Sequence, residues 1–425
     1  RRAAQGSSAG AEGRRLSATP LRWSSASTWE GGTVPTSADT SIMFVSSTTH
    51  LLLDASVDIR IWVIEGSVTF ADEADIALDA EAIIINHGEL RIGSSASPFT
   101  HNAVVTLQGH WQSAQLPIFG IKLIGLTMGK VFMYGQPKTS FVNLASTAAA
   151  ASTTLTLASA PTGWGVGDSL IVTSSTSLEA NCTMLRNDAC QTEEVSITAI
   201  SGSTVTLSAP LSYAHTVETI TADGRTVTLP CEVVNLNRNV KIQGSTGSGT
   251  AGFGGHVMLL QPTNGETAFH HVEFFRMGQS QRVGRYPLHL YAVTEEGGVG
   301  NVSQTSIVGV SVHHSFNRGI NIHGGMGALV QQSTIYKNMG HAFFVEDGSE
   351  TKNVFIGNLG ALTMRAMSLL ESDQTPSTYW ITNCDNIFED NVAAGGDAFG
   401  FWINLPRHPG GFLNFEGATF SNQIF

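Results

Sequence analysis

Histidine and arginine side chains gather in one stretch of the sequence. Residues 256–350 contain eight of the chain's 14 histidines and four arginines. The histidines are His256, His270, His271, His289, His313, His314, His323 and His341. Between residues 270 and 323 the four arginines meet only three glutamates. Arginine binds carboxylates in a two-pronged geometry and histidine transfers protons near neutral pH. This locally basic segment therefore suits an anionic sugar polymer.

Cleavage of such a polymer needs particular groups. Hydrolysis of a glycosidic bond uses two carboxyl groups, one as the acid and one as the base or nucleophile. Elimination from a uronic acid uses a base, together with a cation that neutralises the sugar carboxylate. Carboxylates and histidines that one structural element could bring together are therefore the candidates for this chemistry.

The segment His341 to Gly348 combines a histidine, an apolar strand and two adjacent carboxylates. We treat His341, Glu346 and Asp347 as catalytic candidates, and Asp347 also as a calcium ligand. Side chains alternate along a strand, so only one of the two carboxylates can easily face a groove. The alternative is a charged turn, with Glu350 and Lys352 as local partners.

Two arginine–histidine pairs recur at strand-like spacing. Arg285 and His289 are four residues apart and would share one face of a strand. His323 follows Arg318 after five residues, much as His289 follows Arg285, so the two pairs could stack on neighbouring coils. In one interpretation Arg285, Arg318 and His323 bind substrate and His289 transfers a proton. In the other, all four form a buried hydrogen-bonded ladder.

Aromatic residues near the end of the chain offer a further binding element. Trp402, with Trp380 and Phe401, could stack against sugar rings or pack within the core. We list Trp402 among the substrate-binding candidates.

Short repeats indicate what positions these residues. A Gly followed by alternating apolar residues begins at Gly66, recurs at Gly88 and recurs again at Gly129. Asn317, Asn338 and Asn358 follow one another at similar intervals. Strands recurring every ~20 to 25 residues, with Gly and Asn at the corners, are typical of a β-solenoid. Asparagine tolerates left-handed backbone and can stack in ladders at such corners.

Two segments interrupt the repeat. Residues 146–230 are rich in Thr, Ser and Ala and predict a small inserted β module with a cysteine loop. Residues 361–379 predict a long projecting loop. We expect residues 1–21 to be disordered, 22–145 to be a β-rich domain, and 231–425 to be β-helix coils that continue beyond Phe425.

Composition narrows the class of protein. Of 425 residues, 13% are charged and 42% hydrophobic, with 45 Gly. This mixture disfavours long exposed helices and disordered chains. The net charge of -12 disfavours nucleic acid as a partner. The most apolar window, residues 116–135, contains Lys122 and Lys130, so any membrane attachment would come from segments outside this chain.

Cysteines and sequons indicate an oxidising compartment. Cys182 and Cys190 flank a short polar loop and either form a disulfide or remain free thiols. Asn181 and Asn301 begin N-glycosylation sequons. A sequon beside a plausible disulfide favours a secreted or cell-surface protein.

Several motifs resemble those of one extracellular family. They include Trp-Ser-Ser-Ala-Ser-Thr-Trp-Glu-Gly-Gly at 23–32, Gly284-Arg285-Tyr286-Pro287-Leu288-His289, and residues 253–256, 340–348, 379–383 and 391–402. Their collinear order over residues 22–425 resembles the eight-glycine-domain proteins, which comprise the CEMIP and transmembrane cell-surface hyaluronidases and fibrocystin-like proteins. The resemblance implies an all-β protein, a right-handed parallel β-helix with the inserted module, located outside the cell or on its surface.

The resemblance leaves two functions open. One is a hyaluronidase-like glycosidase that binds and depolymerises hyaluronan or a similar uronic-acid polymer, with calcium as its one candidate cofactor. The other is a non-catalytic, fibrocystin-like surface or matrix protein that binds glycans or protein partners. The family motif commonly has a second histidine where this chain has Tyr291, which favours binding without cleavage. The retained Arg285 and His289 favour the enzyme.

Overall fold

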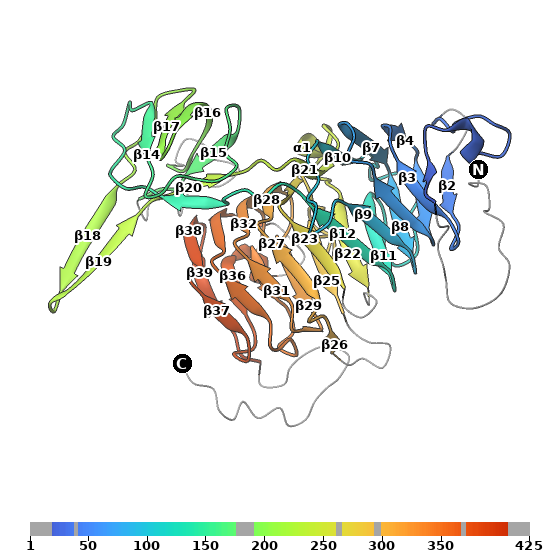
Figure 1. Ribbon diagram of the computed structural model, residues 1–425. Helices are drawn as coiled ribbons and strands as arrows, with labels where there is room; N and C mark the ends of the chain where they lie inside the picture. The colour runs from blue at the N-terminus through green and yellow to red at the C-terminus, as the bar shows by residue number, and fades with distance from the viewer. Residues whose placement is uncertain are drawn as a thin grey trace.

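The computed structural model describes residues 19–37, 41–175, 191–260, 266–292, 299–366 and 371–406. Most of the described chain is β structure wound into stacked coils (Figure 1). Three long parallel sheets run along the stack, and each coil adds one strand to each sheet. The predicted all-β parallel β-helix is confirmed.

Within each of the three sheets, the strands named next to one another below are hydrogen-bonded neighbours. Sheet 1 contains β1 (Leu21–Arg22), β3 (His50–Leu53), β6 (Ser67–Phe70), β9 (Glu89–Ile92), β12 (Lys130–Tyr134), β23 (Thr267–His270), β27 (Thr305–Val308), β31 (Leu329–Gln331), β34 (Val354–Ile356) and β37 (Ile387–Glu389). Sheet 2 contains β38 (Val392–Gly396), β35 (Leu359–Thr363), β32 (Thr334–Asn338), β28 (Ser311–Ser315), β24 (Val272–Phe275), β21 (Val240–Gly244), β10 (Ala103–Leu107), β7 (Ile76–Ala80) and β4 (Val57–Asp58). Sheet 3 contains β2 (Ile42–Val45), β5 (Ile61–Ile64), β8 (Ala82–Asn86), β11 (Leu123–Thr127), β22 (His256–Leu260), β25 (Leu288–Tyr291), β29 (Ile320–His323), β33 (Phe343–Val345), β36 (Ser377–Ile381) and β39 (Phe399–Ile403).

Shorter elements decorate the coils. They are the 3-10 helices η1 (Ala26–Thr28) and η5 (Glu371–Gln374), the helix α1 (Ser248–Ala251), and the paired strands β26 (Gly300–Asn301) and β30 (Gly325–Met326). Within the described ranges, no helix is long and apolar enough to cross a bilayer.

The glycine repeat has a steric cause. Gly66, Gly88 and Gly129 each lie at the corner where sheet 3 leads into sheet 1. A Cβ atom at Gly66 would lie 2.2 Å from the carbonyl oxygen of Ser46. At Gly88 it would lie 2.4 Å from that of Ile64. A side chain cannot fit between the coils at these distances, so each coil needs a glycine at this corner. The number of residues between successive glycines is therefore the length of one coil.

A left-handed residue marks the corner between sheets 1 and 2. Gly309, Gln332, Gly357 and Asp390 occupy it in successive coils, with φ of 62°, 46°, 61° and 52°. Beside them runs a ladder in which Ser333 N–H donates to Asn358 Oδ1 (2.9 Å) and Asn358 N–H to Asn391 Oδ1 (3.0 Å). Of the three asparagines of the sequence repeat, Asn358 belongs to this ladder, but Asn317 and Asn338 lie near the next corner, between sheets 2 and 3. Asn338 and Asn358 are 20 residues apart, which is less than the 25 residues that separate the ladder partners Ser333 and Asn358.

The first coils and the later coils form one body. Strands from residues 21–134 join the same three sheets as strands from 240–403. Residue Leu21, placed in the expected disordered segment, already pairs with Leu51 in sheet 1. Residues 1–18 and the cysteine loop at 176–190 lie outside the described residues.

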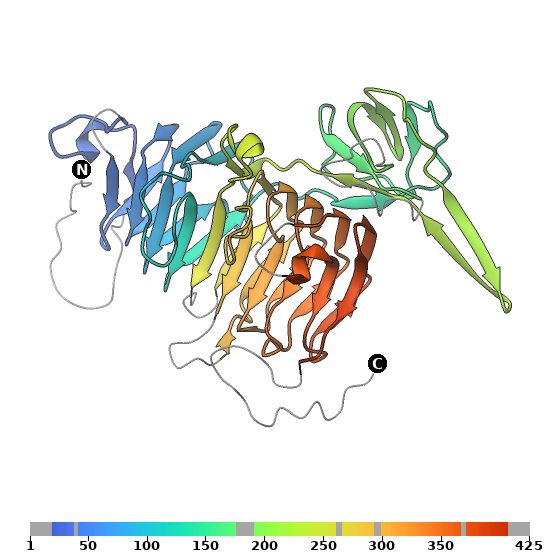
Figure 2. The ribbon, with the colours of Figure 1, turned by 180° about the vertical axis from the view of Figure 1, so that it is seen from behind.

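An antiparallel module is inserted between β12 and β21. Its sheet contains β13 (Phe141–Asn143), β14 (Thr154–Thr156), β15 (Ser169–Val172), β16 (Glu193–Ser201), β17 (Thr204–Leu207) and β20 (Glu232–Asn235). The module has its own apolar core, and a second cluster packs it against β32 and β35 of sheet 2. A hairpin of β18 (Val217–Ala222) and β19 (Arg225–Pro230) projects from it (Figure 2).

Candidate functional site

The candidate residues gather on the outer face of sheet 3. Along β25, Leu288 and Leu290 enter the core, so His289 and Tyr291 face outward. In the next strand Ile320 and Ile322 are inward, and Asn321 and His323 outward. Register pairs His289 with Asn321 and Tyr291 with His323. Strand alternation and parallel pairing together therefore bring polar side chains of neighbouring coils side by side.

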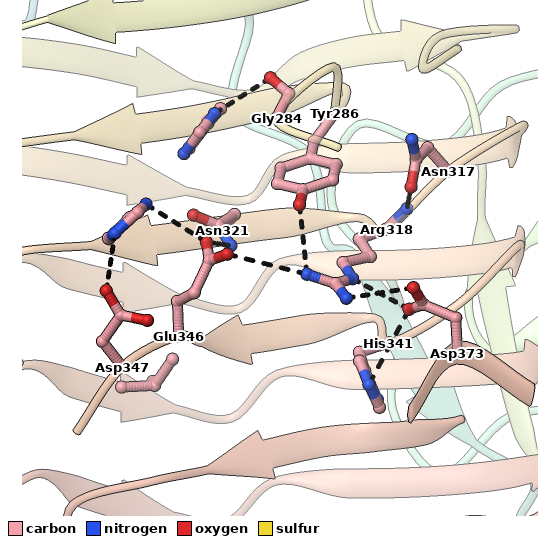
Figure 3. A network of polar contacts seen from close by, with 12 residues as sticks. Gly284, Tyr286, Asn317, Arg318, Asn321, His341, Glu346, Asp347 and Asp373 are labelled. Atoms are coloured by element: carbon pink, nitrogen blue, oxygen red, sulfur yellow. Dashed lines mark hydrogen bonds and ion pairs between the residues drawn. The ribbon is translucent and has the colours of Figure 1, made fainter. Parts of the chain in front are cut away.

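Arg318 is the buried centre of this cluster (Figure 3). Its side chain is 1% exposed, and it donates from Nε to Asp373 Oδ1 (2.8 Å) and from Nη2 to Asp373 Oδ2 (3.0 Å). Its Nη1 donates to the Tyr286 hydroxyl (3.0 Å) and lies 3.8 Å from Glu346 Oε1. The guanidinium also packs 4.1 Å from the ring centre of Phe344. These contacts outweigh the cost of burial and raise the pKa of Arg318.

His323 links two carboxylates. Its Nδ1 lies 3.3 Å from Glu346 Oε2 and its Nε2 lies 2.7 Å from Asp347 Oδ2. Partial burial opposes the charge, but the two carboxylates outweigh it and raise the pKa of His323. The side chains of His323, Glu346 and Asp347 are 17%, 16% and 25% exposed, so these three groups are open to a ligand.

Backbone and amide groups orient the two carboxylates. Asn321 Nδ2 donates to Glu346 Oε2 (2.9 Å). The buried Glu350 carboxylate accepts hydrogen bonds from the N–H groups of Gly324, Asp347 and Gly348. Burial raises the pKa of Glu350. The predicted alternative of Glu350 as a turn partner is therefore observed, and Lys352 pairs instead with Asp385.

His289 and His341 are buried. His289 Nδ1 lies 3.0 Å from the Gly284 carbonyl oxygen, and its ring stacks on His323 at 5.9 Å. His341 Nδ1 accepts a hydrogen bond from Ser377 N–H (3.0 Å), and its Nε2 lies 3.8 Å from Asp373. Burial, aided by neighbouring positive groups, lowers the pKa of both histidines to about 3. Both rings are thus neutral.

Arg285 lies apart from this cluster. Its Nη2 donates to the Ile118 carbonyl oxygen (2.8 Å), and its Nη1 lies 3.6 Å from Met258 Sδ. The prediction that Arg285 and His289 share one face of a strand is therefore wrong, because Arg285 lies before β25. Pro287 separates Arg285 from β25, so the four-residue spacing to His289 does not follow strand geometry.

Trp402 continues an aromatic row across sheet 3. Register pairs Phe344 with Trp380 and Trp380 with Trp402, and the two indole rings stack at 6.2 Å. Trp402 is exposed at the last described strand. Its predicted role in sugar binding stays a prediction.

Other predicted sites are only partly described. Asn181, Cys182 and Cys190 lie outside the described residues. Asn301 is exposed in β26. Among the described cysteines, Cys231 and Cys384 are free thiols.

Asp347 was also predicted to bind calcium. Calcium takes six to eight oxygen ligands. Here Asp347 Oδ2 is engaged by an imidazole, and the grouped side chains of the described site are two histidines and one glutamate. The role of Asp347 as a calcium ligand stays a prediction.

Three residues of the cluster were not among the predicted site residues. Tyr286 stands within the motif at 284–289, and Asn321 stands two residues before His323, so strand alternation could have placed it on the same face. Asp373 belongs to the segment that interrupts the repeat, and no periodicity indicates its partner.

Family models match two parts of the chain. A G8 domain matches residues 28–145, and a CEMIP beta-helix matches residues 252–423. Fibrocystin-L of Mus musculus is 35% identical over 95% of this chain and 10% of its own length. The cell surface hyaluronidase CEMIP2 of Homo sapiens is 32% identical over 44% of this chain and 16% of its own length. The tailspike of Pseudomonas phage phi297 aligns over 84% of this chain and 50% of that chain, with 12% identity and a TM-score of 0.21.

The chain spans about a tenth of the length of the fibrocystin-L sequences that it matches. Over that tenth, the G8 match covers the early coils and the CEMIP beta-helix match covers the coils that carry the cluster on sheet 3. The chain therefore belongs to the family of G8 and CEMIP beta-helix proteins, together with fibrocystin-L and the cell-surface hyaluronidases.

Proposed function

We propose that this chain binds an anionic polysaccharide of the hyaluronan type along sheet 3 and depolymerises it at His323, Glu346 and Asp347. The observation that carries the proposal is the open group of one imidazole between two carboxylates, set on the outer face of a long parallel sheet. A polymer can lie along such a sheet and reach successive coils. The names of the related cell-surface hyaluronidases support the same substrate class.

Hydrolysis is the reaction that this group suits best. Glu346 and Asp347 supply the two carboxyl groups, one as acid and one as base or nucleophile. His323 contacts both carboxylates, at 3.3 and 2.7 Å, and can pass a proton between them. Arg318 and Asn321 hold Glu346 in place. A positively charged His323 also attracts the carboxylate of a uronic acid.

In this scheme the two buried histidines position other residues and do not contact the substrate. His289 supports the His323 ring by stacking, and His341 lies against Asp373, which fixes Arg318. Neither ring reaches solvent, so proton exchange with substrate falls to His323. Arg285, half-buried beside the loop at 116–120, remains a candidate contact for a neighbouring sugar.

Binding without cleavage is the second candidate function. Tyr291 stands where the family motif commonly has a histidine, and its ring lies edge-on to His323 at 4.7 Å. A tyrosine there supplies no group that titrates near neutral pH, and its pKa is raised further by burial and by Asp347. The same face would then hold a glycan without transferring protons.

Incubation with size-defined hyaluronan, chondroitin and alginate separates these functions. Polymer length is measured by light scattering after chromatography, and binding by co-sedimentation. We expect shortening of the uronic-acid polymer by the wild type, and binding without shortening by Glu346→Gln and Asp347→Asn. Glu389→Gln, an exposed glutamate on sheet 1, serves as the control and should behave as wild type. Intact polymer with retained binding would favour the second function. Absence of binding to all three polymers would overturn both.

We further propose that the protein is located outside the cell or on its surface and is glycosylated at Asn301. The exposed position of Asn301 and the cell-surface names of relatives support this. Expression through a secretory pathway should yield a chain whose mass falls on enzymatic deglycosylation. The part of that decrease that Asn301 contributes should be absent in Asn301→Gln, and an unchanged decrease in the variant would rule out this site.

A further inference from the structure

We propose that His289, His323 and Glu346 form a site for a transition-metal ion of the zinc type. The three side chains come from consecutive coils, at β25, at β29 and directly after β33. One ligand atom from each lies within 4.8 Å of the others. The proposal concerns metal binding alone and does not depend on polysaccharide cleavage.

His289 presents a buried lone pair with no partner. Its Nδ1 is 3.0 Å from the Gly284 carbonyl oxygen, which can only accept, so the ring proton resides on Nδ1. Nε2 is then an acceptor, and within the described residues it has no hydrogen-bond partner although the residue is 2% exposed. Buried polar atoms are rarely left unpaired, and a metal ion would complete this one. A backbone carbonyl on the other ring nitrogen is the usual support of a metal-binding histidine.

His323 supplies the second nitrogen. Asp347 Oδ2 lies 2.7 Å from Nε2 and can hold a proton there, and a metal ion would take the place of the proton that Nδ1 shares with Glu346 in the metal-free chain. Nδ1 and Glu346 Oε2 are 3.3 Å apart. Ligand atoms about 2.0–2.1 Å from a tetrahedral zinc ion are separated by roughly 3.3 Å. His323 Nδ1 and Glu346 Oε2 therefore already have the separation of two ligands of a tetrahedral ion. The ligand nitrogen of His289 would have to move closer to these two atoms on metal binding.

Outer groups would hold the third ligand. Asn321 Nδ2 donates to Glu346 Oε2, and Arg318 lies 3.8 Å from Oε1. Carboxylate, amide and carbonyl groups in these positions orient metal ligands and tune affinity. Two imidazoles and one carboxylate form the donor set of zinc sites that keep a fourth position open. Calcium and magnesium prefer oxygen donors and are disfavoured here.

The test is titration of the metal-free chain with Zn²⁺ by isothermal calorimetry, with a chromophoric chelator as competitor. We expect one tight site per chain, which Ca²⁺ in large excess does not displace. Glu346→Gln and His289→Phe should each weaken binding at least about tenfold, since even outer-group mutations cost this much. His270→Gln, a partly buried histidine on sheet 1, is the matched control and should bind as wild type.

The outcomes are distinct. Absence of a stoichiometric site, or tight binding that persists in both variants, would overturn the proposal, as would displacement by Ca²⁺. Glu346 is partly exposed, so Glu346→Gln keeps the test valid if His289→Phe does not fold. Because no polymer is present, failure here leaves the proposed polysaccharide function untouched, and failure of cleavage leaves this result untouched.

Discussion

Arg318 carries a full charge in a position that is almost closed to water. Removing a guanidinium from water is costly, and the cost is offset only when its donors are well paired. Here Asp373 supplies a two-pronged contact, Tyr286 accepts a third hydrogen bond and Phe344 presents a ring face. The buried guanidinium of Arg318, held in place by Asp373, also lies 3.8 Å from the Glu346 carboxylate and helps to fix its position.

Arg318→Met should lower the free energy of unfolding by about 3–5 kcal/mol, because the buried Asp373 carboxylate would lose the guanidinium that makes a two-pronged contact with it. The double variant Arg318→Met with Asp373→Asn should recover part of that loss. Urea titration followed by circular dichroism measures both. Arg22→Met is the control, because Arg22 also pairs with two carboxylates but is exposed to solvent, so this variant should lose much less stability than Arg318→Met.

Glu273 should make stability depend on pH. Burial opposes its charge, but the contacts of His313 and Lys241 outweigh this and lower the pKa of Glu273 from 4.5 to about 2. Its contribution is therefore present above pH 4.5 and is lost as pH falls toward 2. The difference in unfolding free energy between wild type and Glu273→Gln should reach roughly 3 kcal/mol near neutral pH and shrink on acidification. A constant difference from pH 3 to pH 7 would contradict this.

At the scale of the elements, the later coils, from β27 onward, turn from sheet 1 into sheet 2 through one left-handed residue. Glycine adopts this conformation without strain, whereas for an L-residue the left-handed backbone costs about 1–2 kcal/mol of conformational free energy. Gly357 and Gln332 occupy the same corner in neighbouring coils, with φ of 61° and 46°. The chain therefore tolerates strain at some corners and avoids it at others.

Gly357→Ala should reduce the free energy of unfolding by about 1–2 kcal/mol. A Cβ atom there would meet only Gln332 Cγ, at the ordinary contact distance of 3.7 Å, so backbone conformation alone causes the loss. Gln332→Ala keeps an L-residue at the corner and should change stability much less. Equal losses in the two variants, measured by urea unfolding, would show that the backbone is not the cause.

Sequence patterns predicted the coils better than the site. The glycine repeat was readable because Gly66 and Gly88 meet carbonyl oxygens that exclude any side chain. His323 is predictable from its spacing to Arg318, and Glu346 from the motif that begins at His341. Arg285 did not join them, since Pro287 turns the chain before β25 begins. The burial of His341 had no local signal, because it depends on Asp373 from a segment of irregular length.

At the scale of the whole molecule, Arg238 joins the inserted module to the β-helix. It is buried, its Nε donates to the Gly309 carbonyl oxygen (2.9 Å) and its Nη2 to Ser140 Oγ (3.2 Å). Its own N–H donates to Glu273 Oε2 (2.8 Å). One residue, through its side chain and its backbone N–H, thus connects the end of the module, the region of its first strand and two coils of the β-helix.

Arg238→Met should loosen the module without unfolding the coils. The variant loses the side-chain hydrogen bonds of the guanidinium and leaves buried carbonyl groups without that donor. Hydrogen exchange followed by mass spectrometry should show faster exchange in β13, β15 and β20, and unchanged exchange in β5 and β8. Lys138→Met, which removes a half-buried contact to Asp168 within the module, offers a comparison. Unchanged exchange across 141–235 would contradict the assigned role.

The inserted module also bears on how the chain folds. Ser333 meets its partner Asn358 across 25 residues, but Gln243 meets Thr106 of the neighbouring strand across 137 residues. Closing the longer loop costs about 1.5 kcal/mol more in chain entropy. The ends of the insertion lie together, with Gln136 N–H donating to Asn239 Oδ1 at 2.8 Å. A module that folds first would hold these ends close and remove that cost. The inserted module would then fold before the coil that contains β21.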